Sequence, residues 1–265
     1  MEANKEMDQI ISKIDALVPV NSIYSIHRAA KVLYHTGMFV PAQNGIVQVH
    51  RDLLVICDGP CKPEYFKLQG LINQDNTTPA SVMILLHDLA AVQQALLDQH
   101  CFFHEVLRSG GLLYAREGAA ESREIPEFDV AAGQSHKARV WQSRFRRAES
   151  LFSGAELSED PHGVVLAALL SQGMVQLCLA YIADRIGYEP NQLSLKQLFA
   201  VCRMIDPSID EAFPTSRKED RRLFNILIEA DWSLRYRVSA CIDATDQGML
   251  LRRCNDWLER VEVRS

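Results

Sequence analysis

The side chains best suited to bind a ligand lie together near the C-terminus, at Arg235, Tyr236 and Arg237. The planar guanidinium of arginine donates paired hydrogen bonds to phosphate oxygens, and a tyrosine ring can stack on a base. These three residues are therefore the candidate nucleotide-binding or RNA-binding residues. The alternative is that Tyr236 packs inside a helical bundle while both arginines pair with carboxylates, and the sequence favours this alternative. The carboxylates available for such pairs are Glu229, Asp231 and Asp243.

Cysteine and histidine residues do not form a recognisable metal site in the sequence. Cys57 and Cys61 follow His50, but no second pair of ligands comes after them, as a zinc site would require. We therefore expect no metal here. The seven cysteines are scattered and odd in number, which is typical of a reducing compartment. No phosphate-binding glycine loop and no nucleophile elbow occurs.

The first part of the chain alternates between strand-like and helix-like segments. Short runs rich in β-branched residues and bounded by Gly, Pro, Asn or Asp predict strands. Apolar residues spaced three and four apart predict helices. This alternation indicates an α/β or α+β domain with one sheet covered by helices, and we predict the α+β class with a mixed sheet. The predicted strands cover residues 22–26, 46–49, 52–57 and 81–86, and the predicted helices cover residues 8–18, 28–34, 63–73 and 89–98.

A polar segment rich in small residues separates this part from an all-helical part. We interpret residues 1–116 as one domain, residues 117–136 as a linker and residues 137–265 as a second domain. The helical pattern is strongest in a long apolar helix that ends at Gly187, a residue suited to a C-terminal cap, before Pro190. The helices predicted for the second domain cover residues 137–157, 161–187, 195–205, 217–239 and 247–263.

The distribution of charge limits the classes of partner. The chain has a net charge of −6, and the acidic excess lies in residues 1–134, because residues 135–265 carry equal numbers of basic and acidic side chains. This is not the strongly basic composition of a typical nucleic-acid-binding domain, and it gives no sign of DNA binding. Local basic clusters could contact RNA or a nucleotide, or could form solvated helix faces with paired charges. The clusters are Arg144, Arg146 and Arg147; Arg217, Lys218, Arg221 and Arg222; and Arg252 and Arg253.

Two features bear on the location of the protein. No uninterrupted run of about 18 apolar residues is present. The first 15 residues include charged side chains of both signs, unlike a signal peptide. We therefore expect a cytoplasmic protein without a membrane partner.

Several pieces of the helical part, in the right order, resemble the HEPN domain, and together they cover residues 137–265. The resemblance implies a helical bundle and a homodimer formed through this domain. The pieces are Gly187-Tyr188-Glu189-Pro190, NQLSLKQL at residues 191–198, Asp206-Pro207, Phe213-Pro214, RRLFNILIEADWSLRYR at residues 221–237 and LLRRCNDWLERVE at residues 250–262.

Many HEPN domains are ribonucleases that use an arginine followed a few residues later by a histidine. In that chemistry a base deprotonates the 2′-hydroxyl and a guanidinium stabilises the charged phosphorane. The resemblance makes Arg235 a candidate catalytic residue, with Arg237 as the other arginine of that helix. No histidine follows either one, since the last histidine of the chain is His162. The catalytic pair of the family is therefore incomplete.

The first part of the chain resembles a minimal nucleotidyltransferase domain, through RDLLVICDG at residues 51–59 and the segment 82–115. The resemblance implies magnesium ions held by an Asp-x-Asp motif, and a Gly-Ser turn that binds phosphates. Here the motif reads His50-Arg51-Asp52, which leaves Asp52 as the candidate catalytic carboxylate, and the turn reads His27-Arg28-Ala29-Ala30. The strand expected to carry a third carboxylate has none. Magnesium would be a cofactor only if this degenerate site were active.

The sequence as a whole predicts a bacterial-type protein in which a degenerate nucleotidyltransferase-like domain precedes a HEPN domain. We expect a non-catalytic role without a cofactor: binding of a nucleotide or RNA, or interaction with a protein, within a defence or stress system. Two enzymatic alternatives stay open. One is a HEPN ribonuclease that uses Arg235 with an unconventional base, and the other is residual transfer of AMP through Asp52.

Overall fold

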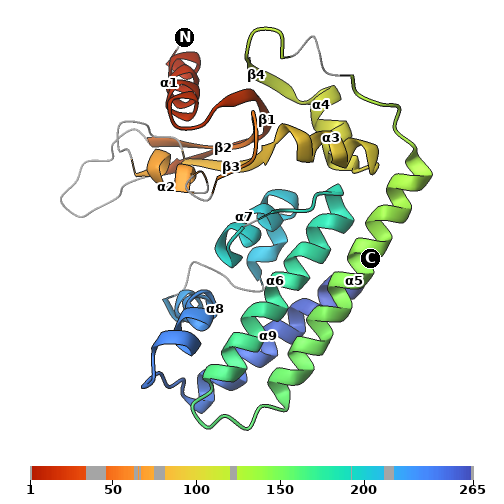
Figure 1. Cartoon of the computed structure of the whole chain (residues 1–265). Helices are drawn as coiled ribbons and strands as arrows, with labels where there is room; N and C mark the ends of the chain where they lie inside the picture. The colour runs from red at the N-terminus through yellow and green to blue at the C-terminus, as the bar shows by residue number, and fades with distance from the viewer. Residues whose placement is uncertain are drawn as a thin grey trace, which may run out of the picture. The chain divides into compact units, whose positions relative to one another are not determined.

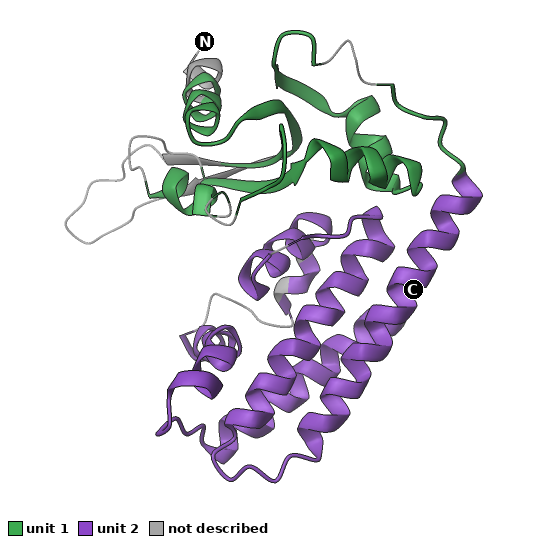
Figure 2. Cartoon of the chain, in the orientation of Figure 1, with its two compact units in different colours: residues 1–129 green, residues 130–265 purple. Residues whose placement is uncertain are grey.

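The computed structural model divides the chain into two compact units, residues 1–129 and residues 130–265 (Figure 2). Unit 1 contains a sheet and helices, and unit 2 is entirely helical among the residues that the structure describes. This confirms the predicted fold class, a mixed sheet with helices followed by an all-helical part. The described residues are 2–33, 46–62, 65, 67–74, 81–119, 124–191, 193–211 and 218–263.

A mixed four-stranded sheet forms the centre of unit 1 (Figure 1). Its strands are β1 (Val20–Leu33), β2 (Ile46–Cys57), β3 (Ser81–Asp88) and β4 (Gly111–Ala115). Their order in the sheet is β3-β2-β1-β4. β1 pairs antiparallel with β2 and β4, whereas β3 runs parallel to β2. The sheet therefore brings segments far apart in the sequence into neighbouring positions.

Helices α1 (Glu2–Leu17) and α2 (Leu68–Asn73) pack on one face of this sheet. The apolar side chains Ile10 and Ile14 recur at the spacing of one helical turn and are buried in the same core as Val55 of β2. The apolar face of α1 is thus held by the sheet.

Helices α3 (Leu89–Leu97) and α4 (Cys101–Ser109) follow β3 directly. The Asp88 carboxylate accepts the backbone N–H of Ala91 at 2.7 Å and so caps the start of α3. Phe103 of α4 contacts His87 edge-on, with 5.1 Å between ring centroids.

Several predictions for unit 1 are wrong in part. The helix predicted over residues 63–73 is an α-helix only over Leu68–Asn73. The helix predicted over residues 28–34 is a strand up to Leu33, because β1 pairs with β2 along this stretch and the ladder of hydrogen bonds outweighs the local helix preference. The strands predicted over residues 46–49 and 52–57 are one strand, β2. The polar residues His50 and Arg51 interrupt the apolar pattern but not the backbone pairing. Residues 34, 63, 64 and 66, and Arg217 of the predicted basic cluster, lie outside the described residues.

Five α-helices build unit 2 in the described part of the chain, as predicted. They are α5 (Val130–Glu156), α6 (Val164–Ile186), α7 (Leu195–Ile205), α8 (Lys218–Tyr236) and α9 (Ala244–Val263), with a short 3-10 helix (Pro207–Glu211) after α7. α6 packs against each of the other four α-helices (Figure 1). Gly187 caps its C-terminal end with a φ of 63°, as predicted.

Among the described helices, α6 is long and apolar enough to cross a membrane. However, 67% of its most apolar stretch is buried inside the protein. The buried side chains include Met174, Leu177 and Ile182. α6 therefore has the character of the central helix of a bundle.

Several helix ends in unit 2 differ from the predicted ones, including the following two. α5 begins at Val130, inside the segment interpreted as a linker over residues 117–136. α8 ends at Tyr236 instead of continuing to residue 239. Arg237 therefore lies just beyond the helix.

The close packing of α5 on α6 depends on Gly173. A Cβ atom at this position would lie 2.2 Å from Cε1 of Phe152, a side chain that is only 2% exposed. We expect Gly173→Ala to lower the free energy of unfolding of unit 2 by about 1–3 kcal/mol, because the buried ring has little room to move. Urea unfolding followed by the helical circular dichroism signal measures this change.

Gly248→Ala is the matched control. Gly248 lies within α9, and no atom lies within 4 Å of a Cβ added there. We expect a gain of up to about 1 kcal/mol from the higher helix propensity of alanine. Equal effects of the two substitutions would show that the packing of α5 on α6 does not depend on Gly173.

Candidate functional site

Helix α8 turns one face to the bundle and the other to solvent. Leu227 lies on its buried face. Two ion pairs join α8 to α9: Arg253 pairs with the buried Asp220, and Arg222 pairs with the buried Asp246. Because a buried carboxylate requires a partner, these pairs fix the orientation of α8 and keep its opposite face in solvent.

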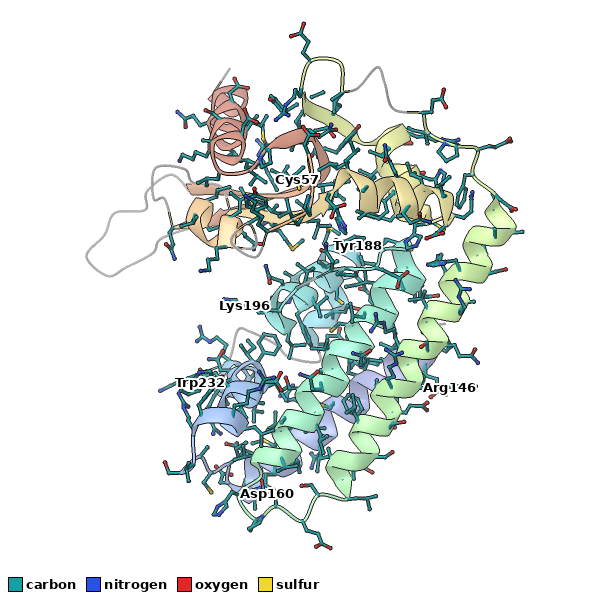
Figure 3. The ribbon with its side chains drawn as sticks, viewed as in Figure 1. Cys57, Arg146, Asp160, Tyr188, Lys196 and Trp232 are labelled. Atoms are coloured by element: carbon teal, nitrogen blue, oxygen red, sulfur yellow. The ribbon has the colours of Figure 1, made fainter. Side chains whose placement is uncertain are left out.

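The solvent face of α8 carries basic residues at its N-terminal end and aromatic residues at its C-terminal end. The helical period of about 3.6 residues places these side chains in one row, which we call the α8 stripe. Every residue of the stripe is exposed. Figure 3 labels one of them, Trp232. The stripe consists of Lys218, Arg221, Asn225, Glu229, Trp232 and Tyr236.

An arginine and two aromatic rings contact each other at the C-terminal end of the stripe. The Trp232 and Tyr236 side chains are 51% and 66% exposed, and their ring centroids lie 5.8 Å apart. The guanidinium carbon of Arg237 lies 4.5 Å from the centroid of the Trp232 ring, a cation–π contact. The same guanidinium pairs with Glu229 at 3.4 Å. Exposed rings of this size offer stacking surfaces to a planar ligand.

A cavity of about 310 Å³ lies beside this cluster. Residues of α8, the first turn of α6 and residues 239–242 line it. Its apolar lining includes Ala230, Ile226 and Ile242, which pack together. Its polar lining includes Ser233 and Arg237. The volume lies at the lower end of the range for small-molecule sites.

A shallower hollow of about 810 Å³ extends along α8 from the cavity. Ile226 and Glu229 line both spaces, so the two lie next to each other along the helix. Lys218 and Arg221 also line the hollow, and neither makes an ion pair within the described part of the chain. At the end of the hollow away from the cavity, these two basic side chains lie beside one acidic side chain, Glu219.

The structure separates the three candidate binding residues. Arg237 lines the cavity, and Tyr236 lies on the stripe beside Trp232. Arg235 is exposed, lies about 100° from Tyr236 around the helix and does not line the cavity. The alternative in which Tyr236 packs inside the bundle is wrong, whereas the pairing of Arg237 with Glu229 is confirmed.

The candidate catalytic residue Asp52 lies in unit 1, within a hydrogen-bonded cluster. Its carboxylate is fully buried and accepts two hydrogen bonds, from His27 Nδ1 to Oδ2 at 3.0 Å and from His50 Nε2 to Oδ1 at 3.0 Å. The other ring nitrogen of His50, Nδ1, lies 2.6 Å from Ser81 Oγ. The two imidazole side chains are 41% and 40% exposed. We call these four residues the Asp52 cluster.

Pairing between three strands brings the Asp52 cluster together. His50 and Asp52 are two residues apart on β2, so they lie on the same face of the sheet. Ser81 of β3 is the partner of His50, and His27 of β1 is the partner of Asp52. A register shift between Ser25 and His27 moves β1 by one residue, and this bulge places His27 opposite Asp52.

The hydrogen bonds indicate where the protons of His50 lie. Because a carboxylate only accepts, Nε2 of His50 carries the hydrogen that points to Asp52. In the neutral ring, Nδ1 then has a lone pair that accepts the hydroxyl hydrogen of Ser81. The hydrogen bond to Asp52 raises the pKa of His50 above its ordinary value of 6.5, and partial burial of the ring offsets part of this rise.

The ligand set of the Asp52 cluster differs from that of a magnesium site. Magnesium prefers oxygen ligands, but the cluster has a single carboxylate whose two oxygens both accept hydrogen bonds from imidazoles. One carboxylate with two imidazoles is a set better suited to zinc. As arranged, the cluster is equipped for acid–base chemistry, because an imidazole titrates near neutral pH.

Three candidate functional residues were not evident from the sequence: His27, Ser81 and Trp232. His27 and Ser81 are far from Asp52 in the chain, and the bulge that aligns His27 leaves no pattern in the sequence. For Trp232 the sequence does contain a pattern that indicates its position. It precedes Tyr236 by four residues, a spacing that puts both rings on one side of a helix.

The comparisons with known proteins include a distant structural likeness. Neither models of known protein families nor curated proteins match this chain. Among solved structures, a nucleotidyltransferase-like protein from Exiguobacterium sibiricum 255-15 is similar, with 13% sequence identity and a TM-score of 0.27. The match covers 94% of this chain and 78% of that chain. At this TM-score the likeness carries no argument about activity.

The raised pKa of His50 is expected to depend on Asp52. In Asp52→Asn a neutral amide replaces the carboxylate that favours the imidazolium, while partial burial of the ring remains. We therefore expect the pKa of His50 to fall to 6.5 or below in this variant. NMR titration of the imidazole protons measures it. An unchanged pKa would show that the hydrogen bond to Asp52 is not formed in solution.

The same shift makes the stability of unit 1 depend on pH. A histidine whose pKa is raised on folding stabilises the fold below its unfolded pKa, and this contribution is lost as the pH rises through the folded pKa. Opening free energies from hydrogen exchange of the β2 amides should therefore show a wild-type advantage over His50→Gln below pH 6.5 that shrinks as the pH rises above this value. An advantage that grows with pH would contradict this assignment.

Proposed function

We propose that unit 2 binds a planar base together with its phosphate, either as a free nucleotide or as part of a single-stranded RNA. The observation that carries this proposal is the pair of exposed rings, Trp232 and Tyr236, next to Arg237 at a cavity of about 310 Å³. Stacking of bases on exposed aromatic side chains is a general way to bind single strands without reading their sequence.

The cavity has the composition expected for a base or nucleoside. Its apolar residues Ala230, Ile226 and Ile242 offer van der Waals contact to a flat ring. The hydroxyl groups of Ser233 and Ser239 also line it and can hydrogen-bond to the polar edge of a base or to a ribose.

Arg237 can bind phosphate after exchanging its present partner. Its contact with Glu229, at 3.4 Å, joins two side chains that are each about half exposed. An exposed ion pair of this kind contributes only about 0–1 kcal/mol. A phosphate carries more charge than a carboxylate and fits the guanidinium fork, so it can replace Glu229 when this exposed side chain turns away.

The basic end of the α8 stripe favours RNA over a single nucleotide. Arg221 and Tyr236 are fifteen residues apart, which corresponds to about 22 Å along the helix. A single nucleotide at Trp232 cannot reach that far. Lys218 and Arg221 are well placed to neutralise the phosphates of neighbouring nucleotides instead.

The proposed role is binding without catalysis. The resemblance of residues 137–265 to the HEPN domain is in keeping with RNA as a ligand. A ribonuclease of this type would need Arg235 close to the bound strand, but Arg235 does not line the cavity. No histidine follows Arg235 or Arg237 in the chain.

Isothermal titration calorimetry with a single-stranded RNA of about 12 nucleotides tests the proposal. We expect Trp232→Ala and Tyr236→Ala each to weaken binding by about 10-fold, because stacking of one base contributes about 1–3 kcal/mol. Arg237→Gln should weaken the binding of RNA and of AMP alike. Arg221→Gln should weaken the binding of RNA and leave that of AMP unchanged.

Arg146→Gln is the charge-matched control. Arg146 is an exposed arginine on α5, which Figure 3 labels apart from Trp232 on α8. Its removal changes the net charge as Arg221→Gln does, without touching the α8 stripe. RNA affinities that are the same in this control and in the two aromatic variants would disprove the proposal.

Exposed apolar residues at the end of α8 favour a second role, contact with another copy of this chain. Leu234 and Val238 are 49% and 105% exposed. Burial of such side chains drives association, and the resemblance to the HEPN domain implies a homodimer. Size-exclusion chromatography with light scattering should give a dimer for the wild type and a monomer for Leu234→Glu combined with Val238→Glu. A monomeric wild type would exclude this role.

A further inference from the structure

The Asp52 cluster contains an arrangement that the proposed role of unit 2 does not use. Ser81 Oγ lies 2.6 Å from His50 Nδ1, and His50 Nε2 lies 3.0 Å from the Asp52 carboxylate. A hydroxyl, an imidazole and a carboxylate are thus joined in series. We propose that Ser81, His50 and Asp52 act as nucleophile, base and orienting carboxylate, and that this site attacks carboxylic esters.

His50 meets the geometric requirement for the base. Its Nδ1 accepts the Ser81 hydroxyl hydrogen, so the proton has a direct path from the nucleophile to the ring. Asp52 holds the opposite nitrogen and stabilises the imidazolium that forms when the proton moves. His27 occupies the second oxygen of the carboxylate and so fixes the orientation of Asp52. We call the series Ser81, His50 and Asp52 the relay. Residues of three strands, β1, β2 and β3, therefore hold it in place.

The relay can be reached from solvent. The side chain of His50 is 40% exposed, and Ser81 is half-buried at the first residue of β3. The Asp52 side chain is fully buried, with 0% exposed. A substrate can therefore approach the nucleophile and base while the carboxylate stays shielded from water, which strengthens its interaction with the ring.

The surroundings of the relay favour a neutral substrate. Strand alternation places Leu54 and Met83 next to it on the same face, and both are apolar. Arg51 lies between His50 and Asp52 on β2 and so belongs to the opposite face. An ester carbonyl needs no cation in its ground state.

The reaction runs in two balanced steps. Ser81 Oγ bonds to the carbonyl carbon while its proton moves to His50 Nδ1; the ester C–O bond then breaks, and the leaving alkoxide takes that proton and departs as an alcohol. Water attacks the resulting acyl-serine with His50 again as the base. The acid is released and the hydroxyl of Ser81 is restored.

Covalent capture tests the site on the full chain without relying on turnover. A fluorophosphonate probe should form an Oγ–P bond at Ser81 with loss of fluoride, and peptide mass spectrometry locates the adduct. The labelling rate should rise as His50 loses its proton. We expect Ser81→Ala to abolish this label, and His50→Gln, which can still hydrogen-bond to both neighbours, to slow labelling by at least about 100-fold.

Ser25 is the matched control within the same molecule, since it is also a half-buried strand serine but has no histidine partner among the described residues. Ser25→Ala should leave the labelling unchanged. Labelling of Ser81 no faster than that of Ser25 in the wild type would overturn the proposal. So would an unchanged rate in His50→Gln. RNA binding by unit 2 is measured separately, so failure of one proposal does not affect the other.

Discussion

A carboxylate that is withdrawn from water must have a hydrogen-bonding or cationic partner, and this requirement governs how several elements of the chain are held together. Asp52, Asp220 and Asp246 are 0%, 4% and 2% exposed. In each case a partner comes from a different element: His27 of β1 for Asp52, and an arginine of the neighbouring helix for the other two. Each hydrogen bond or ion pair to one of these buried carboxylates therefore holds two strands or two helices in a fixed relative position.

The consequence is clearest for α8. Its ion pairs with α9 set the rotation of the helix about its own axis, and this rotation decides which residues meet water. Trp232 and Tyr236 are exposed because the opposite face is fixed, not because the bundle lacks room for aromatic rings. Elsewhere in unit 2, Phe199 and Trp257 are buried. The exposure of two neighbouring aromatic rings on α8 therefore supports the proposed role of this surface in ligand binding.

Much of the fold could be predicted from the periodicity of apolar residues, but the functional details could not. The chain over residues 28–33 contains good helix formers, yet pairing with β2 makes it a strand. His50 and Arg51 break the apolar alternation of β2, so the sequence pattern of this one strand resembles that of two. The bulge before His27 and the end of α8 at Tyr236 depend on tertiary contacts that no local pattern encodes.

The placement of the tryptophans has a practical consequence for spectroscopy. The chain has three, and Trp141, Trp232 and Trp257 all lie in unit 2. Trp257 is 3% exposed and Trp232 is 51% exposed. Tryptophan emission, excited where tyrosine does not absorb, therefore reports on the helical unit alone, with one shielded, one half-buried and one water-accessible emitter. The sheet of unit 1 can melt without changing that spectrum, so a single emission transition does not establish that the whole chain unfolds in one step.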